Sequence, residues 1–599
     1  MSIGRIPKRN IGGWAREIID SCSASLVDRI QRGAVYRSMF LVGDENGAPQ
    51  TYNKTQSHVE KMSANIYLPN TLRFSITPPE DVGPDERAKA KRAANELNLN
   101  IASSDTDLCL EEAFDWALIK GKTFVKMGWD ARKKELQSWL LQPEYMGVLR
   151  EDVGTLDKQE AFFQSTYMIP EEFRRRIAGL PDEKELWRKV QAYITPSKDG
   201  EGPDRDTMLK QVILGGTNPY QAAGQNSGQT ARGLVNWLAG PAPTWSPKTL
   251  AGIIRFDELW VWDTDREDWV TIQLVGNDCV VEGKTVQRNI FSTDPQNPLS
   301  YADDDNPLKG IHPFLEICPN PLHGYFWGLS AIPVIALAQK TLNARVDGIN
   351  KLLRKQEDPP MYARGGGSIN EIALSRLRKP GGWMTDPNPN AEVKVMAPEI
   401  PAGLYESMHE AEAIFEEVAG ETAVTQGKGE SGVRAQGHAE TLVRMASPRL
   451  KRKALRGERQ VAKVGGLAFL ILQAKSDRKF KVWLPESEAG IQASLEPSDP
   501  LAQAPAPKMK AIEFRLKDVD EDAKVGVDSH SSSPVFAADA RELVEWMVSK
   551  GIISAERAIE LLHPPMEDEL VADAERKRVE EAELIRQHPE LLTQGKKKK

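Results

Sequence analysis

Apolar residues recur every three or four positions in two stretches of the chain, 330–356 and 404–418, as one stripe along a helix requires. The stripe of the first stretch is formed by Ile335, Ala338, Leu342, Val346, Ile349 and Leu353. That of the second is formed by Leu404, Met408, Ala411, Phe415 and Val418. The first run stops at Asp358-Pro359-Pro360, because a residue before proline is pushed out of helical geometry. The pattern predicts two helices with a break between them.

The polar faces of the two predicted helices carry opposite charges. Basic residues of the first are Lys340, Arg345, Lys351, Arg354 and Lys355. Acidic residues of the second are Glu406, Glu410, Glu412, Glu416 and Glu417. Each apolar stripe is too narrow for a core of its own, so we expect the helices to pack partly against neighbouring copies, and a head-to-tail contact that closes makes a ring. The residues expected at this contact are Lys340, Arg345, Glu406, Glu410 and Glu412.

Short apolar runs bounded by Gly, Pro and Asn lie between the two helices, at 361–363, 381–384 and 393–396. They predict the strands of a small exposed module. Its basic residues are Arg364, Arg376, Arg378 and Lys379, and Trp383 stands among them. A solvated hairpin with scattered charge would explain this composition, so only the order of the segments favours a more specific role.

A glycine-rich loop, 421–436, follows the second helix, and a strongly basic helical stretch continues to 475. The cations of that stretch spread around most of a helix, so they cannot all face one DNA duplex. A mixture of subunit interface and solvated face is the better interpretation. Pro448 should kink this helix or end a first piece at Ser447.

Upstream of this region the sequence predicts a helix at 110–117, followed by Gly121 and then by a strand at 124–126. Further on come His312-Pro313-Phe314, residues 328–330, Gln339 and 342–345; the C-terminal part has 528–534, 540–546, 551–554 and 558–562. In this order the segments resemble the portal proteins of tailed bacteriophages, the ring at one capsid vertex through which DNA enters and leaves. The resemblance spans most of the chain and rests on order and spacing.

The resemblance implies an α+β fold with wing, α-helical stem, small β-containing clip and helical crown. The wing would be 1–329, with the Gly- and Asn-rich stretch 197–245 as a flexible insertion that has no family counterpart. The stem would be 330–357 and 403–420, the clip 358–402 and the tunnel loop 421–436. The long wing helix and return strands would occupy 437–530, and the crown with its basic tail 531–599.

The resemblance further implies a homo-oligomeric ring, a dodecamer in the virion, with no enzymatic activity and no cofactor. Its partners would be the terminase, the major capsid and scaffolding proteins, the tail adaptor, and double-stranded DNA in the channel. Lys428 and Arg434 of the tunnel loop would touch DNA phosphates. The terminase would contact the clip through Arg376, Arg378, Lys379 and Trp383.

The charge balance fits a channel better than a protein that grips DNA over its whole surface. The chain has 599 residues with 78 basic and 86 acidic side chains, a formal charge of -8. Duplex DNA carries about one charge per 1.7 Å, so sparse cations in an acidic tube would let it slide. Four widely spaced cysteines predict free thiols. We expect no membrane span and no secretory signal.

Two motifs suggest nucleotide binding but lack its context. The glycines at 427–432 match a dinucleotide fingerprint, which needs a buried strand before it, whereas here a helix precedes it. Gly121-Lys122-Thr123 ends like a phosphate-binding loop, yet Trp116 stands where that motif requires glycine. No histidine pair has metal-ligand spacing. A packaging ATPase or other DNA-processing enzyme that uses the loop at 427–432 remains the alternative.

Overall fold

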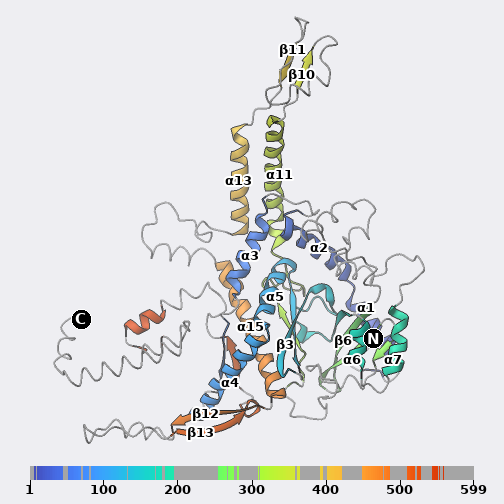
Figure 1. Ribbon diagram of the computed structural model, residues 1–599, viewed down its shortest axis with the longest axis vertical. Coiled ribbons are helices and arrows are strands. Elements are labelled where there is room, and N and C mark those ends of the chain that lie inside the picture. The colour runs from blue at the N-terminus through green and yellow to red at the C-terminus, as the bar shows by residue number, and fades with distance from the viewer. Residues whose placement is uncertain are drawn as a thin grey trace, which may run out of the picture. The chain divides into compact units, whose positions relative to one another are not determined.

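The computed structural model describes residues 6–44, 52–79, 83–194, 254–281, 308–357, 361–364, 392–395, 401–420, 448–485, 509–527, 543–553 and 558, with short gaps inside some of these ranges. The chain forms two compact units: unit 1 is Met1–Ser63 with Glu112–Arg449, and unit 2 is Ala64–Glu111 with Leu450–Lys599. Both mix helices and strands (Figure 1), which confirms the α+β class. Among the described residues no helix is long and apolar enough to cross a membrane.

Unit 1 contains most of the described elements. Its helices are α1 (Ile11–Cys22), α2 (Leu26–Val42), α6 (Pro170–Ile177), α7 (Glu183–Ile194), α11 (Ile332–Glu357) and α13 (Ala402–Ala419), with short 3-10 turns at Pro143–Tyr145 and Leu156–Lys158. Its strands are β2 (Thr123–Asp130), β3 (Glu135–Leu141), β4 (Met146–Val148), β5 (Ala161–Met168), β6 (Ile254–Asp263), β7 (Asp268–Val275), β8 (Cys279–Val281), β9 (Phe314–Ile317), β10 (Met361–Arg364) and β11 (Glu392–Val395). The division between the units falls inside α3 (Lys54–Ile66) and α5 (Thr106–Lys120).

A five-stranded antiparallel sheet in the order β4-β5-β6-β7-β8 forms the centre of unit 1. Successive side chains of a strand point to opposite faces. One face, with Leu259 and Val261 of β6, is covered by Ala15 and Ile18 of α1. Because both faces are buried, the run from Leu259 to Trp262 of β6 is apolar without alternation.

The other face of this sheet packs against a second sheet, β3-β2-β9, through a cluster of aromatic rings. Phe162 and Trp260 are paired across β5 and β6, and their rings stack 6.1 Å apart. Phe314 of β9 meets the edge of both rings, at 5.4 Å. Lys126 of β2 forms a buried ion pair with Glu258 of β6 inside this interface. The two sheets therefore share one core.

The predicted helix, glycine, strand passage is present as α5, Gly121 and β2. Gly121 has a φ of 101°, and its amide donates to Ala117 O at 2.8 Å, which ends α5 in the manner of a glycine C-cap. Cys22, Cys109 and Cys318 are free thiols, as the spacing predicted.

Asp115, half-buried in α5, gives unit 1 a pH dependence that can be tested. Burial raises its pKa above the ordinary value, a hydrogen bond with Ser63 opposes this, and nearby Glu60 and Glu112 raise it further. The folded state thus binds more protons, and stability falls as pH rises from the unfolded pKa, about 3.9, through the folded one. Asp115→Asn should therefore raise the melting temperature at pH 7 by about 1–2 °C.

This gain should shrink near pH 3, below the unfolded pKa of about 3.9, where both the folded and the unfolded state bind the proton. Thermal unfolding at both pH values measures it. Asp152→Asn is the matched control. Arg150 lowers the pKa of the exposed Asp152, so this substitution should not raise the melting temperature at pH 7. A lower melting temperature for Asp115→Asn at pH 7 would contradict the expected sign.

Unit 2 pairs the first strand of its chain with the last. It contains β1 (Phe74–Thr77), α4 (Pro84–Ser103), α15 (Pro448–Lys475), β12 (Lys479–Pro485), β13 (Met509–Arg515), a 3-10 turn at Leu516–Asp518, and β14 (Lys524–Val527). Two antiparallel ribbons, β1-β14 and β12-β13, flank the helices. Asn98 of α4 binds both backbone groups of Phe74, at 2.8 and 3.0 Å. Gly465 of α15 leaves room for the Phe74 ring.

The long basic helix is present from Pro448, and its first residue is proline, which helices accept at that position because the amide there needs no partner. Residues 437–447, where the sequence also predicts helix, lie outside the described residues, as does the insertion 197–245. In the predicted crown the structure describes a helix at 543–549.

Candidate functional site

The start of helix α11 is hydrogen-bonded to the end of α5, and we call residues 328–332, which make this turn, the corner. The hydroxyl of Ser330 donates to Ile119 O at the end of α5 and accepts from the amide of Ile332 at 3.1 Å. The amide of Ala331 donates to Leu118 O at 2.8 Å. Ser330 thus caps the first turn of α11, as serine commonly does at a helix start. The corner explains why Gly121, Gly328 and Ser330 occur together in the sequence pattern.

Helices α11 and α13 lie side by side and form a hairpin (Figure 1). Ile335 and Ala338 of α11 pack against Phe415 of α13, all buried. Strands β10 and β11 pair antiparallel, with Met361 opposite Val395, so they join the far ends of the two helices. Both helices and both of these strands were predicted from the sequence.

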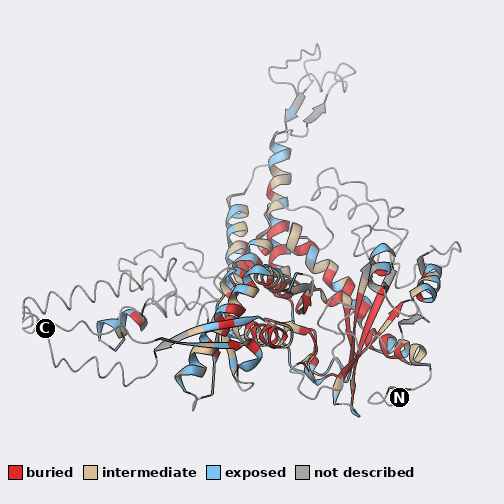
Figure 2. Ribbon diagram, turned by 60° about the horizontal axis from the view of Figure 1, so that its bottom comes forward, coloured by how far each residue is buried: buried red, intermediate tan, exposed pale blue. Residues whose placement is uncertain are grey.

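The apolar stripe of α11 is buried only along part of its length. Ile335, Ala338, Leu342 and Ile349 are buried, whereas Leu353 is 37% exposed. Phe415 lies opposite residues 335–338 and thirteen residues after the start of α13. With an equal rise in both helices, α11 runs beyond α13 from about residue 350. The last turns of α11 consequently lack a partner helix (Figure 2).

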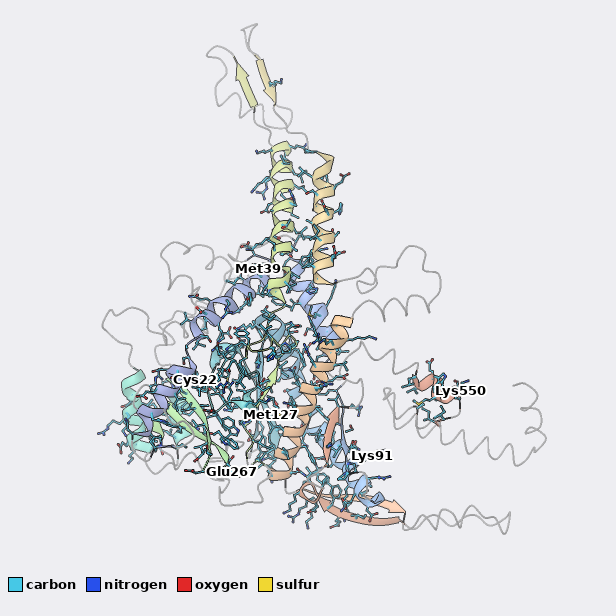
Figure 3. The ribbon with its side chains drawn as sticks, turned by 180° about the vertical axis from the view of Figure 1, so that it is seen from behind. Cys22, Met39, Lys91, Met127, Glu267 and Lys550 are labelled. Atoms are coloured by element: carbon cyan, nitrogen blue, oxygen red, sulfur yellow. The ribbon has the colours of Figure 1, made fainter. Side chains whose placement is uncertain are left out.

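The outward faces of the hairpin differ in character. On α11, Val334 is 63% exposed and Leu337 is 75% exposed. On α13, Glu406 and Glu410 are exposed, and Ile414 is 46% exposed beside them. Figure 3 shows side chains standing outward along both helices. The hairpin therefore presents an apolar face with flanking cations on one helix and an acidic face on the other.

The predicted contact residues of the hairpin do not all have the same surroundings. Lys340 and Arg345 are exposed on α11, as are Glu406 and Glu410 on α13. Glu412 is different, because it accepts from Tyr52 Oη at 2.7 Å and forms an ion pair with Lys54 of the same chain. A contact between copies is thus not needed to account for the charge of Glu412.

Lys54 and Tyr52 are functional candidates that the sequence did not indicate. Lys54 Nζ bridges Glu412 and Glu416, with 3.0 Å to Glu416 Oε1. The lysine and Glu416 are 362 positions apart in the chain. The one local signal is Asn53, which caps α3 by accepting from the amide of Gln56 at 3.3 Å. A cap predicts where a helix starts and says nothing about its distant partners.

A second set of contacts ties the same segment to α11. The side chain of Gln339 accepts from the Lys54 amide at 3.1 Å and donates to Tyr52 O at 2.8 Å. It also donates to Asn343 Oδ1 at 2.7 Å, and Asn343 donates to Gly43 O at 2.8 Å. Gln339 is fully buried. Gln339 and Asn343 of α11 thus hold the N-terminal part of the chain.

The pKa values of this cluster follow its contacts. Burial opposes the charged form of Lys54, but hydrogen bonds to Glu412 and Glu416 outweigh it and raise the pKa of the amine. The hydrogen bond to Glu412, together with burial, raises the pKa of Tyr52. Lys54 is therefore charged and Tyr52 neutral at physiological pH.

Other predicted site residues lie outside the described residues: Arg376, Arg378, Lys379 and Trp383 of the clip, and Lys428 and Arg434 of the loop 421–436. Of the clip, the structure describes the β10-β11 ribbon, where Lys394 is exposed. The glycine-rich motif at 427–432 also lies outside the residues that the structure describes.

The second nucleotide-like motif has a structural explanation. Lys122 is 2% exposed, and its amine donates to Glu316 Oε2 at 2.9 Å and to Gly154 O at 3.0 Å. It also lies 3.6 Å from the centre of the Phe326 ring. Lys122 joins β2, β9 and a loop of the body and is not available to a phosphate.

No known protein-family model matches this chain, and no curated protein matches it either.

Proposed function

We propose that the chain is the subunit of a portal-like ring that conducts double-stranded DNA through a capsid vertex. In this proposal α11 and α13 are the stem, the module containing β10 and β11 is the clip that docks the terminase, and residues 421–436 reach the channel. The protein contributes a passive channel, and ATP hydrolysis belongs to its motor partner. The assembled ring resides in the virion and later holds the tail adaptor.

The observation that carries the proposal is the pair of unlike outward faces on the hairpin. Leu337 and Val334 expose more apolar surface than a helix in water normally would, and contiguous exposed apolar surface commonly marks an interface. The neighbouring helix offers Glu406 and Glu410, while Arg345 flanks the apolar face. An apolar and basic face on one side and an acidic face on the other suit a head-to-tail contact between identical copies, and such a contact makes a ring where its rotation closes.

The passage of DNA is the second part of the proposal. Phosphate contacts position DNA without reading its sequence, so a few cations per subunit suffice for a channel. Lys428 and Arg434 are the candidates. The overall charge of -8 supports weak contacts of this kind, because a strongly basic tube would retain the duplex.

Native mass spectrometry at micromolar concentration tests ring formation. Wild-type protein should give one closed high-mass species. Leu337→Glu should disrupt it, because each interface loses about 1–3 kcal/mol of apolar burial and gains a charge near the acidic face of the next copy. Circular dichroism should show an unchanged fold, since Leu337 makes few contacts within the chain.

Leu99→Glu is the matched control, because Leu99 is also well exposed, at 60%, but lies on α4 of unit 2. It should leave the rings intact. Wild-type protein that stays monomeric, or rings that tolerate Leu337→Glu, would remove the proposal. ATP turnover by the purified protein above background would favour the packaging enzyme.

A further inference from the structure

The segment 52–55 is held by two sets of contacts, one with α11 and one with α13, and the two sets differ in physical character. Towards α11 the contacts are hydrogen bonds of neutral groups, made by the fully buried Gln339 and by Asn343, which is 7% exposed. Such bonds inside the protein are insensitive to salt, because screening acts on exposed charges. The attachment of α11 to the N-terminal segment therefore does not depend on exposed charges.

Towards α13 the polar contacts depend on charge, whereas the buried Phe415 packs against α11 and lies edge-on to the ring of His58. Lys54, Glu412 and Glu416 retain 18%, 23% and 25% of their side-chain exposure, so ions and water reach them. The carboxylates are one helical turn apart and face the same amine. Tyr52 also donates to Glu412, and His409 lies 3.7 Å from Glu412. Removing one charge weakens the whole cluster.

Lys54 also compensates the end of α13. Helix C-termini carry a partial negative charge that cations stabilise. Helix α13 has no basic residue in its last turn, and Glu416 adds negative charge there. Lys54 supplies a cation from another helix to Glu416, which lies in the last turn of α13.

From these contacts we infer that Lys54, Glu412 and Glu416 form an ionic latch that holds the last turn of α13 and can open while Phe415 stays packed against α11. Opening frees the end of the helix that leads directly into residues 421–436. The inference rests on the proposed function only where it assigns those residues to the channel.

Hydrogen exchange followed by mass spectrometry on the full chain tests the latch. Lys54→Met should increase the exchange rate of amides in 412–420 about tenfold at low salt, because hydrogen bonds to charged groups are among the stronger ones. Amides of 335–345 in α11 should keep their protection. Raising salt from about 0.1 M to about 1 M shortens the screening length from about 10 Å to about 3 Å and should move wild type toward the variant.

Two further variants make the outcome decisive. Lys54→Arg keeps the charge and should retain protection of 412–420. Lys133→Met removes a lysine whose side chain is 66% exposed and paired with Glu135, and should change nothing in α13. Unchanged exchange of 412–420 in Lys54→Met, or equal loss of protection in α11 and α13, would overturn the latch. Ring formation is measured separately by mass, so a protein without rings could still show a latch, and rings could form without one.

Discussion

Gly121→Ala is expected to destabilise unit 1 by about 3–4 kcal/mol or more, because two separate costs fall on one residue. Its φ of 101° lies in a region that residues with a Cβ rarely adopt. A Cβ there would also lie 2.8 Å from Trp327 O and 3.2 Å from the backbone of Gly328. Those are main-chain atoms of the corner that starts α11, and they cannot yield as a flexible side chain would.

Urea unfolding monitored by tryptophan fluorescence measures this loss. Gly154→Ala is the control, because a Cβ at Gly154 would meet nothing within 4 Å, and its effect should stay within about 0.5 kcal/mol. A Gly121→Ala protein as stable as the Gly154→Ala protein would show that the corner can shift, and the described anchoring of α11 would then be wrong.

Removing one partner of the buried pair Lys120–Glu144 should be nearly as damaging. Both side chains are 7% exposed, and the lysine also donates to Gln142 at 2.6 Å. Glu144→Met leaves a buried cation without its carboxylate and should lower the free energy of unfolding by about 3–5 kcal/mol. Combining it with Lys120→Met should recover most of the loss, since apolar side chains of similar size often replace a buried pair without penalty.

The pH dependence of the free energy of unfolding tests the same prediction in a second way. Burial lowers the pKa of Lys120, and Glu144 partly opposes this. The folded state therefore binds fewer protons than the unfolded one, and stability rises with pH between the folded pKa and the unfolded value of about 10.4. Without Glu144 this pKa falls further, so the defect of Glu144→Met should shrink as the pH rises from 7 toward that unfolded value. A single variant no worse than the double one would contradict the account.

The hairpin could be predicted from the sequence because its information is local. Ile335, Ala338 and Phe415 show helical spacing within short windows, and prolines at 359 and 360 mark the break. The same windows do not reveal which part of a stripe is covered. Leu353 belongs to the predicted stripe but lies beyond the end of α13, and its exposure depends on the relative lengths of two helices.

The central sheet and the ionic latch depend on information that the local sequence lacks. Trp260 and Val261 are adjacent in β6 and equally apolar, because one faces the aromatic cluster and the other faces α1. Such a strand has no alternation to indicate it. Lys54 looks like any lysine in a first helical turn, and only the fold brings it to α13.

The pairing of β1 with β14 constrains the order in which the protein can be made. Phe74 pairs with Val527, so the first strand of unit 2 emerges from the ribosome roughly 450 residues before its partner. At about 5–20 residues per second this interval is roughly 20–90 s. Unit 1 has its whole chain once Arg449 is made, before β14 is synthesised. Until β14 follows, β1 is an unpaired edge that other chains could join. Asn98, which holds both backbone groups of Phe74 from only 24 residues away, can bind within the nascent chain and cover that edge first.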